Sequence, residues 1–151
     1  MTAEPVERGQ PPAPVVLIAE DDEGHASLIE RSLKRCGIST ACHRFRDGQE
    51  VLDFLFKVSK STPPAGLSPH ILFLDGRMPK MSGQEVLRQI QHHRALKAMP
   101  LTIVATTDDS QELESFKALG CTRHLKKPVD IKALRQMLSH VQPDRHPPRE
   151  C

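Results

Sequence analysis

Four short apolar segments of the chain are followed by residues that could perform chemistry together. Glu20, Asp21 and Asp22 follow the first of these segments, and Asp75 follows another. Two hydroxyl groups and one ammonium group come after the remaining segments, on Thr106, Thr107 and Lys127. Asp75 lies 54 residues after Asp21 and 52 residues before Lys127, so only the fold can bring these groups together.

Carboxylates that lie close together repel one another unless a proton or a cation intervenes. A hard divalent ion with oxygen ligands is the natural counter-charge, and Mg²⁺ fits best. Such a site suits transfer of a phosphoryl group to a carboxylate, in which Asp75 attacks phosphorus and the cation and Lys127 neutralise the equatorial oxygens. Donors after the fourth strand would bind a further oxygen. The residues alone leave open whether Asp21 or Asp22 binds the metal.

Each of these residues also has a simpler structural explanation when it is taken alone. An aspartate after a strand often caps the next helix, threonine is common in strands, and a lysine before a proline can point into water. The functional interpretation therefore depends on the residues acting as a group.

The hydrophobic pattern predicts five strands that alternate with five helices. Short apolar runs predict strands at 15–19, 38–45, 71–74, 101–105 and 121–126. Apolar residues three and four apart predict helices at about 24–36, 48–58, 83–94, 113–119 and 131–141. Gly37 and Gly120 are placed to end the first and fourth of these helices, and Asp47 to cap the second.

This alternation indicates a doubly wound α/β domain. Strand-helix-strand units with right-handed crossovers build a parallel sheet that helices cover on both faces. Ligands bind such sheets beyond the carboxyl ends of the strands. The acidic residues and Lys127 are therefore expected at the functional edge of the sheet.

Length, charge and proline placement bound the possibilities further. A chain of 151 residues suits one domain, and 21 basic against 19 acidic residues give no global field for nucleic acid or membrane surfaces. Prolines crowd both ends, so we expect disordered tails at 1–13 and 142–151 around a domain at 14–141. Without a long apolar stretch or an apolar leader, the chain is expected to be cytoplasmic, with its four cysteines reduced.

Three segments of the sequence resemble the receiver domains of two-component response regulators. They are VLIAEDDEGH at 16–25, LFLDGRMPKMSG at 72–83 and HLKKPVD at 124–130, and the resemblance covers about residues 14–141. The middle segment is the most specific, because the family's phosphorylated aspartate is followed at this distance by Met-Pro and then Gly. The resemblance implies a flavodoxin-like five-stranded parallel sheet in the order 2-1-3-4-5.

The resemblance also implies a role for each site residue. Asp75 is the implied phosphoacceptor, with Glu20 and Asp21 as the acidic pair for Mg²⁺. The implied third ligand to the metal, beside the carboxylates, is the backbone carbonyl of Arg77. Lys127 is the implied phosphate-binding lysine, and its peptide bond to Pro128 is usually cis in the family. Asp22 is expected instead to begin the loop or to cap the first helix.

Two positions depart from the family pattern. Ala105 falls where the family usually has the Ser or Thr that follows the phosphoryl group, and Thr106 and Thr107 come next. Either the strand shifts by one residue and Thr106 serves, which we favour, or the hydroxyl contact is missing. His124 falls where an aromatic residue commonly swings inward on activation, and a histidine can also rotate.

The implied function is that of a single-domain response regulator. It would accept a phosphoryl group on Asp75 from the phosphohistidine of a histidine kinase and act through altered protein contacts, since only ten residues follow Val141. The segments DGQEVLDFLF and ATTDD and the long loop at 61–69 resemble small regulators that partner phytochrome-type histidine kinases. A homodimer could form through the fourth helix, the fifth strand and the fifth helix. The downstream protein is unknown.

Other readings fit the sequence less well. Phosphatases with an aspartyl nucleophile usually carry a second aspartate two residues later, where this chain has Arg77. A receiver-like module that binds partners without phosphate stays open because of Ala105 and His124. The histidines at 92 and 93 suit a basic helix end better than a metal site, and the absence of Trp and Tyr disfavours nucleic-acid binding.

Overall fold

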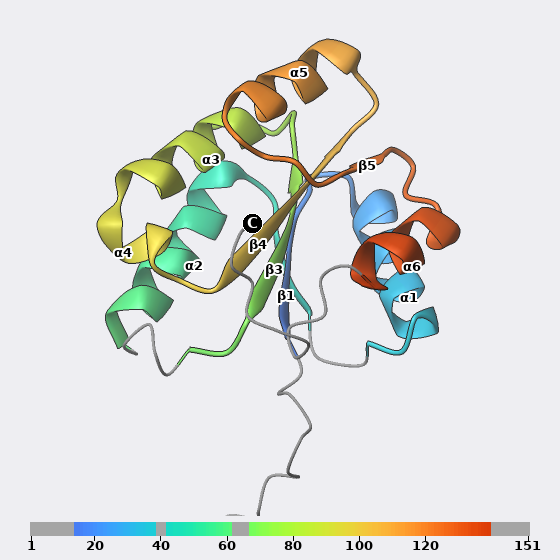
Figure 1. Cartoon of the computed structure of the whole chain (residues 1–151), viewed down its shortest axis with the longest axis horizontal. Coiled ribbons are helices and arrows are strands. Elements are labelled where there is room, and N and C mark those ends of the chain that lie inside the picture. Colours follow the sequence, from blue (N-terminus) through green and yellow to red (C-terminus); the bar gives the residue numbers. More distant parts are fainter. Residues whose placement is uncertain (1–13, 39–41, 62–66, 140–151) are drawn as a thin grey trace, which may run out of the picture.

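A five-stranded parallel sheet forms the middle of three layers in the computed structural model, which describes residues 14–38, 42–61 and 67–139. Figure 1 shows one layer of helices on each side of the sheet. The strands are β1 (Val15–Ala19), β2 (Cys42–Phe45), β3 (His70–Asp75), β4 (Leu101–Thr107) and β5 (His124–Lys126). Their order is β2-β1-β3-β4-β5 with parallel pairing throughout, which confirms the doubly wound, flavodoxin-like prediction.

The helices divide unequally between the two faces. One face carries α1 (Glu23–Arg35) and α6 (Ile131–Ser139). The other face carries α2 (Gly48–Ser61), α3 (Gly83–His92), α4 (Arg94–Lys97) and α5 (Ser110–Ala118). Both faces of the central strands are therefore covered, as their continuous apolar sequences require.

Alternating side chains of β3 pack into two separate cores. Leu72 and Leu74 join the core beneath α2, α3 and α5, whereas Ile71 and Phe73 join the core beneath α1 and α6. All six residues of β3 are buried. Packing on both faces fixes the end of this strand, and with it the position of Asp75.

Short polar side chains cap three of the helices, and the caps at Asp22 and Asp47 agree with the sequence prediction. The Asp22 carboxylate accepts hydrogen bonds from the amides of Gly24 and His25 at the start of α1. Asp47 accepts from the Glu50 amide at the start of α2, and Ser82 caps α3. Each cap satisfies amide groups that have no partner within the helix.

A glycine ends α1, and the following strand begins later in the sequence than predicted. Gly37 has a φ of 91°, its amide donates to the Lys34 carbonyl, and the Ile38 amide donates to the Leu33 carbonyl. These are the bonds of a Schellman motif. The predicted strand at 38–45 is therefore wrong at its start, because Ile38 completes the helix end and β2 begins at Cys42; residues 39–41 lie outside the described ranges.

The same motif shortens the last strand. Gly120 has a φ of 93°, and the amide of Cys121 donates to the Phe116 carbonyl at the end of α5. Cys121 is thus part of the helix cap, and β5 covers 124–126 rather than the predicted 121–126.

Two further boundaries differ from the prediction. β4 continues to Thr107, so that Thr106 pairs with Asp75 and Thr107 with Lys126 inside the sheet. The region predicted as the end of one helix is divided at His93, whose extended backbone separates α3 from α4. Burial of Leu96 in the core explains the extra turn, which periodicity around 83–94 did not reveal.

Some predictions concern residues outside the described ranges. They are the two tails at 1–13 and 142–151 and the end of the last predicted helix at Val141. Among the described helices, none is long and apolar enough to cross a membrane.

Gly83 allows the start of α3 to lie directly against the end of β3. A Cβ atom at this position would lie 2.2 Å from the Asp75 carbonyl oxygen and 3.0 Å from Cζ of Phe116. The first contact involves backbone, which cannot move aside without displacing β3. The glycine is therefore needed for close packing at the functional edge.

We expect Gly83→Ala to lower the free energy of unfolding by about 1–3 kcal/mol, because the added methyl group overpacks this contact. Gly24→Ala is the matched control, since its nearest neighbour would be the Asp22 carboxylate at 3.4 Å. Urea unfolding of both variants measures the difference. Equal stability of the two variants would contradict the assignment of Gly83 to close packing.

Candidate functional site

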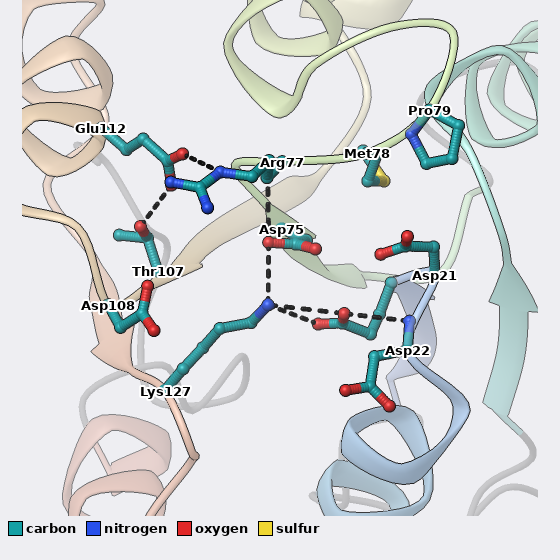
Figure 2. A pocket seen from close by; sticks show the side chains of 11 residues that line it. Asp21, Asp22, Asp75, Arg77, Met78, Pro79, Thr107, Asp108, Glu112 and Lys127 are labelled. Atoms are coloured by element: carbon teal, nitrogen blue, oxygen red, sulfur yellow. Dashed lines mark hydrogen bonds and ion pairs between the residues drawn. The ribbon is translucent and has the colours of Figure 1, made fainter.

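An open pocket of about 430 Å³ lies at the carboxyl ends of the strands. Figure 2 shows the side chains that line it, with the Lys127 ammonium directed to the centre. Acidic residues predominate over the two basic ones, and the lining comprises Glu20, Asp21, Asp22, Asp75, Arg77, Met78, Pro79, Thr107, Asp108, Glu112 and Lys127. The pocket is thus at the edge of the sheet where the sequence predicted the site.

Three carboxylates meet in this pocket. Glu20, Asp21 and Asp75 each place an oxygen within 4.8 Å of the others. The register explains this convergence, because Ala19 pairs with Leu74 and the next residue of each segment is acidic. Glu20 and Asp75 are buried, whereas Asp21 is exposed.

Lys127 brings a positive charge to the same point. Its ammonium nitrogen lies 3.1 Å from Oδ1 of Asp75 and 3.4 Å from Oε1 of Glu20. The following peptide bond, from Lys127 to Pro128, is cis. Lys127 comes directly after β5 and donates its amide hydrogen to the Thr107 carbonyl, which fixes its position relative to β4.

Asp75, Glu20 and Lys127 shift one another's pKa values. Burial and the charge of Glu20 raise the pKa of Asp75 to about 6. Burial also raises the pKa of Glu20, but the hydrogen bond from His25 and the charge of Lys127 bring it below its usual value. The pKa of Lys127 is raised, because the charges of Asp75 and Glu20 outweigh its own burial.

Charge balance identifies what the cluster would bind. Two carboxylate charges within 4.8 Å of each other repel by at least about 3 kcal/mol at an effective dielectric constant of about 20. With all three carboxylates ionised, the single charge of Lys127 leaves two negative charges uncompensated. An all-oxygen donor set with that residual charge fits a hard dication such as Mg²⁺ or Mn²⁺.

The structure separates the roles of Asp21 and Asp22. Asp22 is occupied as the N-cap of α1, as expected. Asp21 belongs instead to the carboxylate cluster with Glu20 and Asp75. Of the two aspartates, Asp21 is thus the one that lies beside Asp75 in the carboxylate cluster.

Arg77 connects Asp75 to the start of α5. Its backbone amide donates to Oδ1 of Asp75 at 3.2 Å. Its guanidinium donates to Glu112 at 2.8 Å and to Asp109 at 3.2 Å. The side chain therefore points away from the carboxylate cluster and spans one side of the pocket (Figure 2).

Thr107, rather than Thr106, places its side chain on the pocket. Thr107 lines the pocket and donates its hydroxyl hydrogen to Glu112 at 2.6 Å. Thr106 is 1% exposed and is not a lining residue. The preference for Thr106 was therefore wrong, because alternate residues of β4 face opposite sides and Thr107 shares the side of Ala105.

The two positions that depart from the family pattern are neighbours. Ala105 is completely buried and pairs with His124 across β4 and β5. His124 is exposed at the first residue of β5. Neither residue lines the pocket.

Comparison with known proteins agrees with this geometry. The sequence matches the response regulator receiver domain over residues 16–139. This chain belongs to that family. A curated relative of the receiver, the probable methanogenesis regulatory protein FilR2 of Methanothrix harundinacea, is 30% identical over 129 residues, which cover 85% of this chain and 81% of the relative.

Solved structures resemble this receiver domain over most of their length. The bacteriophytochrome response regulator RtBRR has a TM-score of 0.70 and 26% identity, covering 85% of this chain and 78% of that one. The Mn²⁺-bound form of response regulator Rcp1 has a TM-score of 0.60 and 26% identity, covering 85% and 91%. The Rcp1 structure holds Mn²⁺, and this chain has a cluster of three carboxylates.

Sequence reasoning gave no role to two residues that organise the site, Glu112 and His25. Thr107 and Glu112 are linked by a hydrogen bond, and His25 holds Glu20 at 2.8 Å. Glu112 could have been found from its position in the first turn of a helix that begins at the functional edge of the sheet. His25 carried a weaker signal, as a polar residue at a position where α1 faces the core.

We expect Asp75→Asn to raise the free energy of unfolding by on the order of 2 kcal/mol at about pH 7.5 in the absence of divalent cations. The pKa of Asp75 is about 6 in the folded chain against an ordinary value of 3.8, so ionisation destabilises the fold. The penalty grows as pH rises from about 4 to about 6 and is complete above that range.

Urea unfolding in a chelator at about pH 4 and about pH 7.5 measures this difference. Asp53→Asn is the control, because Asp53 is exposed on α2 and does not line the pocket. A stability gain that is the same at both pH values, or that the control shares, would contradict the expectation.

Proposed function

We propose that this receiver domain accepts a phosphoryl group on Asp75 from the phosphohistidine of a histidine kinase and signals through altered protein contacts. The observation that carries the proposal is the convergence of Asp75 with Glu20, Asp21 and Lys127 at one edge of the sheet. The position of each residue in the family motif agrees with the role proposed for it.

Asp75 is suited to act as the nucleophile. Its Oδ1 accepts hydrogen bonds from the Arg77 amide and from Lys127, and among the described residues Oδ2 has no hydrogen-bond partner. In the proposed reaction, an Asp75 oxygen forms a bond to phosphorus while the phosphorus–nitrogen bond of phosphohistidine breaks. The electron pair stays on the imidazole nitrogen, and the product on this chain is an acyl phosphate.

Neighbouring groups would stabilise the transferred phosphoryl group. Lys127 stands 3.1 Å from Asp75 and would pair with a phosphoryl oxygen. Glu20, Asp21, Asp75 and the Arg77 carbonyl would hold Mg²⁺, which when bound would neutralise charge on the phosphoryl oxygens. The proposed role of the surrounding carboxylates is to hold the cation.

Thr107 is the hydroxyl proposed to respond to phosphorylation. It now donates to Glu112, which also accepts from Arg77. A phosphoryl oxygen would compete with Glu112 for this hydroxyl, which would loosen the start of α5. We propose that the surface of α5, β5 and α6 changes its partner affinity in this way.

The proposed partners follow from the family and its neighbours. Because RtBRR is named a bacteriophytochrome response regulator, we propose a phytochrome-type histidine kinase as the phosphoryl donor. We also propose a cytoplasmic location, no enzymatic activity beyond its own phosphorylation and dephosphorylation, and a homodimer that can form through α5, β5 and α6. The downstream protein is unknown.

One observation favours a second candidate, a module that binds its partner without phosphate. Ala105 is buried at the position where the family usually has a hydroxyl, and it cannot bind a phosphoryl oxygen. Such a module would keep the fold and the docking surface but would form no acyl phosphate.

We expect incubation with acetyl phosphate and Mg²⁺ to add one phosphoryl group, detected by intact-mass spectrometry and located on Asp75 by peptide mapping. Asp75→Asn should abolish the adduct without loss of fold, because its amide is not a nucleophile. No adduct on the wild type would favour the phosphate-independent module. Rapid release of phosphate without a stable adduct would indicate a phosphatase instead.

We expect Lys127→Ala to slow this labelling by at least roughly tenfold, because a positive charge at the transferred group is lost. The variant should also show smaller amide shifts in α5, β5 and α6 on treatment with beryllofluoride. Lys126→Ala is the matched control, since Lys126 is the exposed neighbour of Lys127. Wild-type labelling and shifts in the Lys127 variant would contradict its role.

A further inference from the structure

His25 joins two parts of the site that are far apart in sequence. It lies in the first turn of α1 and is 9% exposed. Its Nδ1 is 2.8 Å from Oε1 of Glu20, and its Nε2 is 3.2 Å from the backbone nitrogen of Val129. Val129 follows the Lys127–Pro128 peptide bond and is itself buried.

The two contacts require one particular form of the ring. The Val129 amide can only donate, so Nε2 of His25 must accept and carry no proton. The ring proton then resides on Nδ1, where it is donated to the Glu20 carboxylate. A ring with its proton on Nε2, or on both nitrogens, would leave the Val129 amide without an acceptor in a buried position.

The orientation of Glu20 depends on few groups. Oε2 accepts from the Asp22 amide at 3.2 Å, Oε1 lies against His25, and both oxygens are near Lys127. The Glu20 side chain is only 1% exposed, so water does little to hold it. Of these contacts, the one with His25 is the shortest.

We propose that His25 is a positioning residue that orients Glu20 toward a divalent cation and couples the cation site to the loop between β5 and α6. This inference rests on the proposed function, because the cation site is part of it. The bridge runs from the carboxylate cluster through α1 to Val129, which leads into α6. A cation bound in the pocket would therefore affect the face of the sheet that α1 and α6 cover.

A purely structural role predicts a different outcome. A buried histidine that only satisfies the Val129 amide would contribute stability and leave cation affinity unchanged. Partners of metal-binding carboxylates typically change metal affinity 10–100-fold when they are removed. Affinity and stability therefore distinguish the two roles.

The first experiment uses the unaltered protein. Long-range ¹⁵N–¹H correlation spectra report which nitrogen of the His25 ring carries the proton. We expect the proton on Nδ1, with Nε2 as the acceptor of the Val129 amide. A ring protonated on Nε2 would overturn the proposal, and this result does not depend on whether any variant folds.

The second experiment measures Mg²⁺ affinity by isothermal titration calorimetry. We expect His25→Leu to weaken binding roughly 10–100-fold. His25→Gln should retain most of the affinity, because its amide supplies both a donor and an acceptor. His92→Leu is the matched control, since His92 is exposed on α3 and does not line the pocket. Unchanged affinity in folded His25→Leu would overturn the proposal.

The third measurement tests the coupling. On addition of Mg²⁺, we expect the Val129 amide resonance to shift in the wild type and in His25→Gln. In His25→Leu at saturating Mg²⁺, the amide resonances of residues 75–77 should still shift, whereas the Val129 amide resonance should not. A full Val129 response in His25→Leu would show that the bridge does not transmit occupancy.

These outcomes separate the inference from the proposed function. A wild type that binds no Mg²⁺ and accepts no phosphoryl group would overturn both. A wild type that binds Mg²⁺ and becomes labelled on Asp75, together with a His25→Leu variant of equal affinity, would overturn only the role of His25.

Discussion

The register of two central strands creates the electrostatic problem on which this site depends. Pairing of β1 with β3 places Glu20 and Asp75 side by side, and Asp21 adds a third carboxylate. Burial in two cores prevents either strand from moving away. The repulsion must be offset by charge instead, and Lys127 compensates only part of it. Burial and the charge of Glu20 together raise the pKa of Asp75, and the same crowding would favour binding of a dication.

The same crowding explains how the pocket could communicate with the rest of the domain. Each central group is tied to a different element: Asp75 through Arg77 to α5, Glu20 through His25 to α1, and Lys127 to the chain leading to α6. A change of charge at Asp75 would therefore alter the balance of contacts in several elements at once. Arg77 and Glu112 occupy the side of the pocket closest to Thr107.

The fold and the acidic cluster could be predicted because both depend on local pattern. Apolar runs that are followed by acidic residues mark the strands. Glycines that follow the helical pattern mark the helix ends. Thr107 could not be chosen over Thr106, because the choice depends on where β4 ends and which side each residue faces. Val129 lies 104 residues from His25, and Glu112 lies 35 residues from Arg77, so the local sequence did not predict these contacts. The start of β5 was missed because Cys121 serves the helix cap instead.

Anomalous diffraction from crystals grown with Mn²⁺ tests the central claim most directly. Compensation of crowded carboxylates by a dication predicts one strong anomalous peak among the oxygens of Glu20, Asp21 and Asp75, with the Lys127 ammonium outside its coordination shell. Loss of that peak in crystals of Asp21→Asn would follow from the same cause. A fully ordered pocket without a peak at saturating Mn²⁺, or a peak bound by other residues only, would contradict the account.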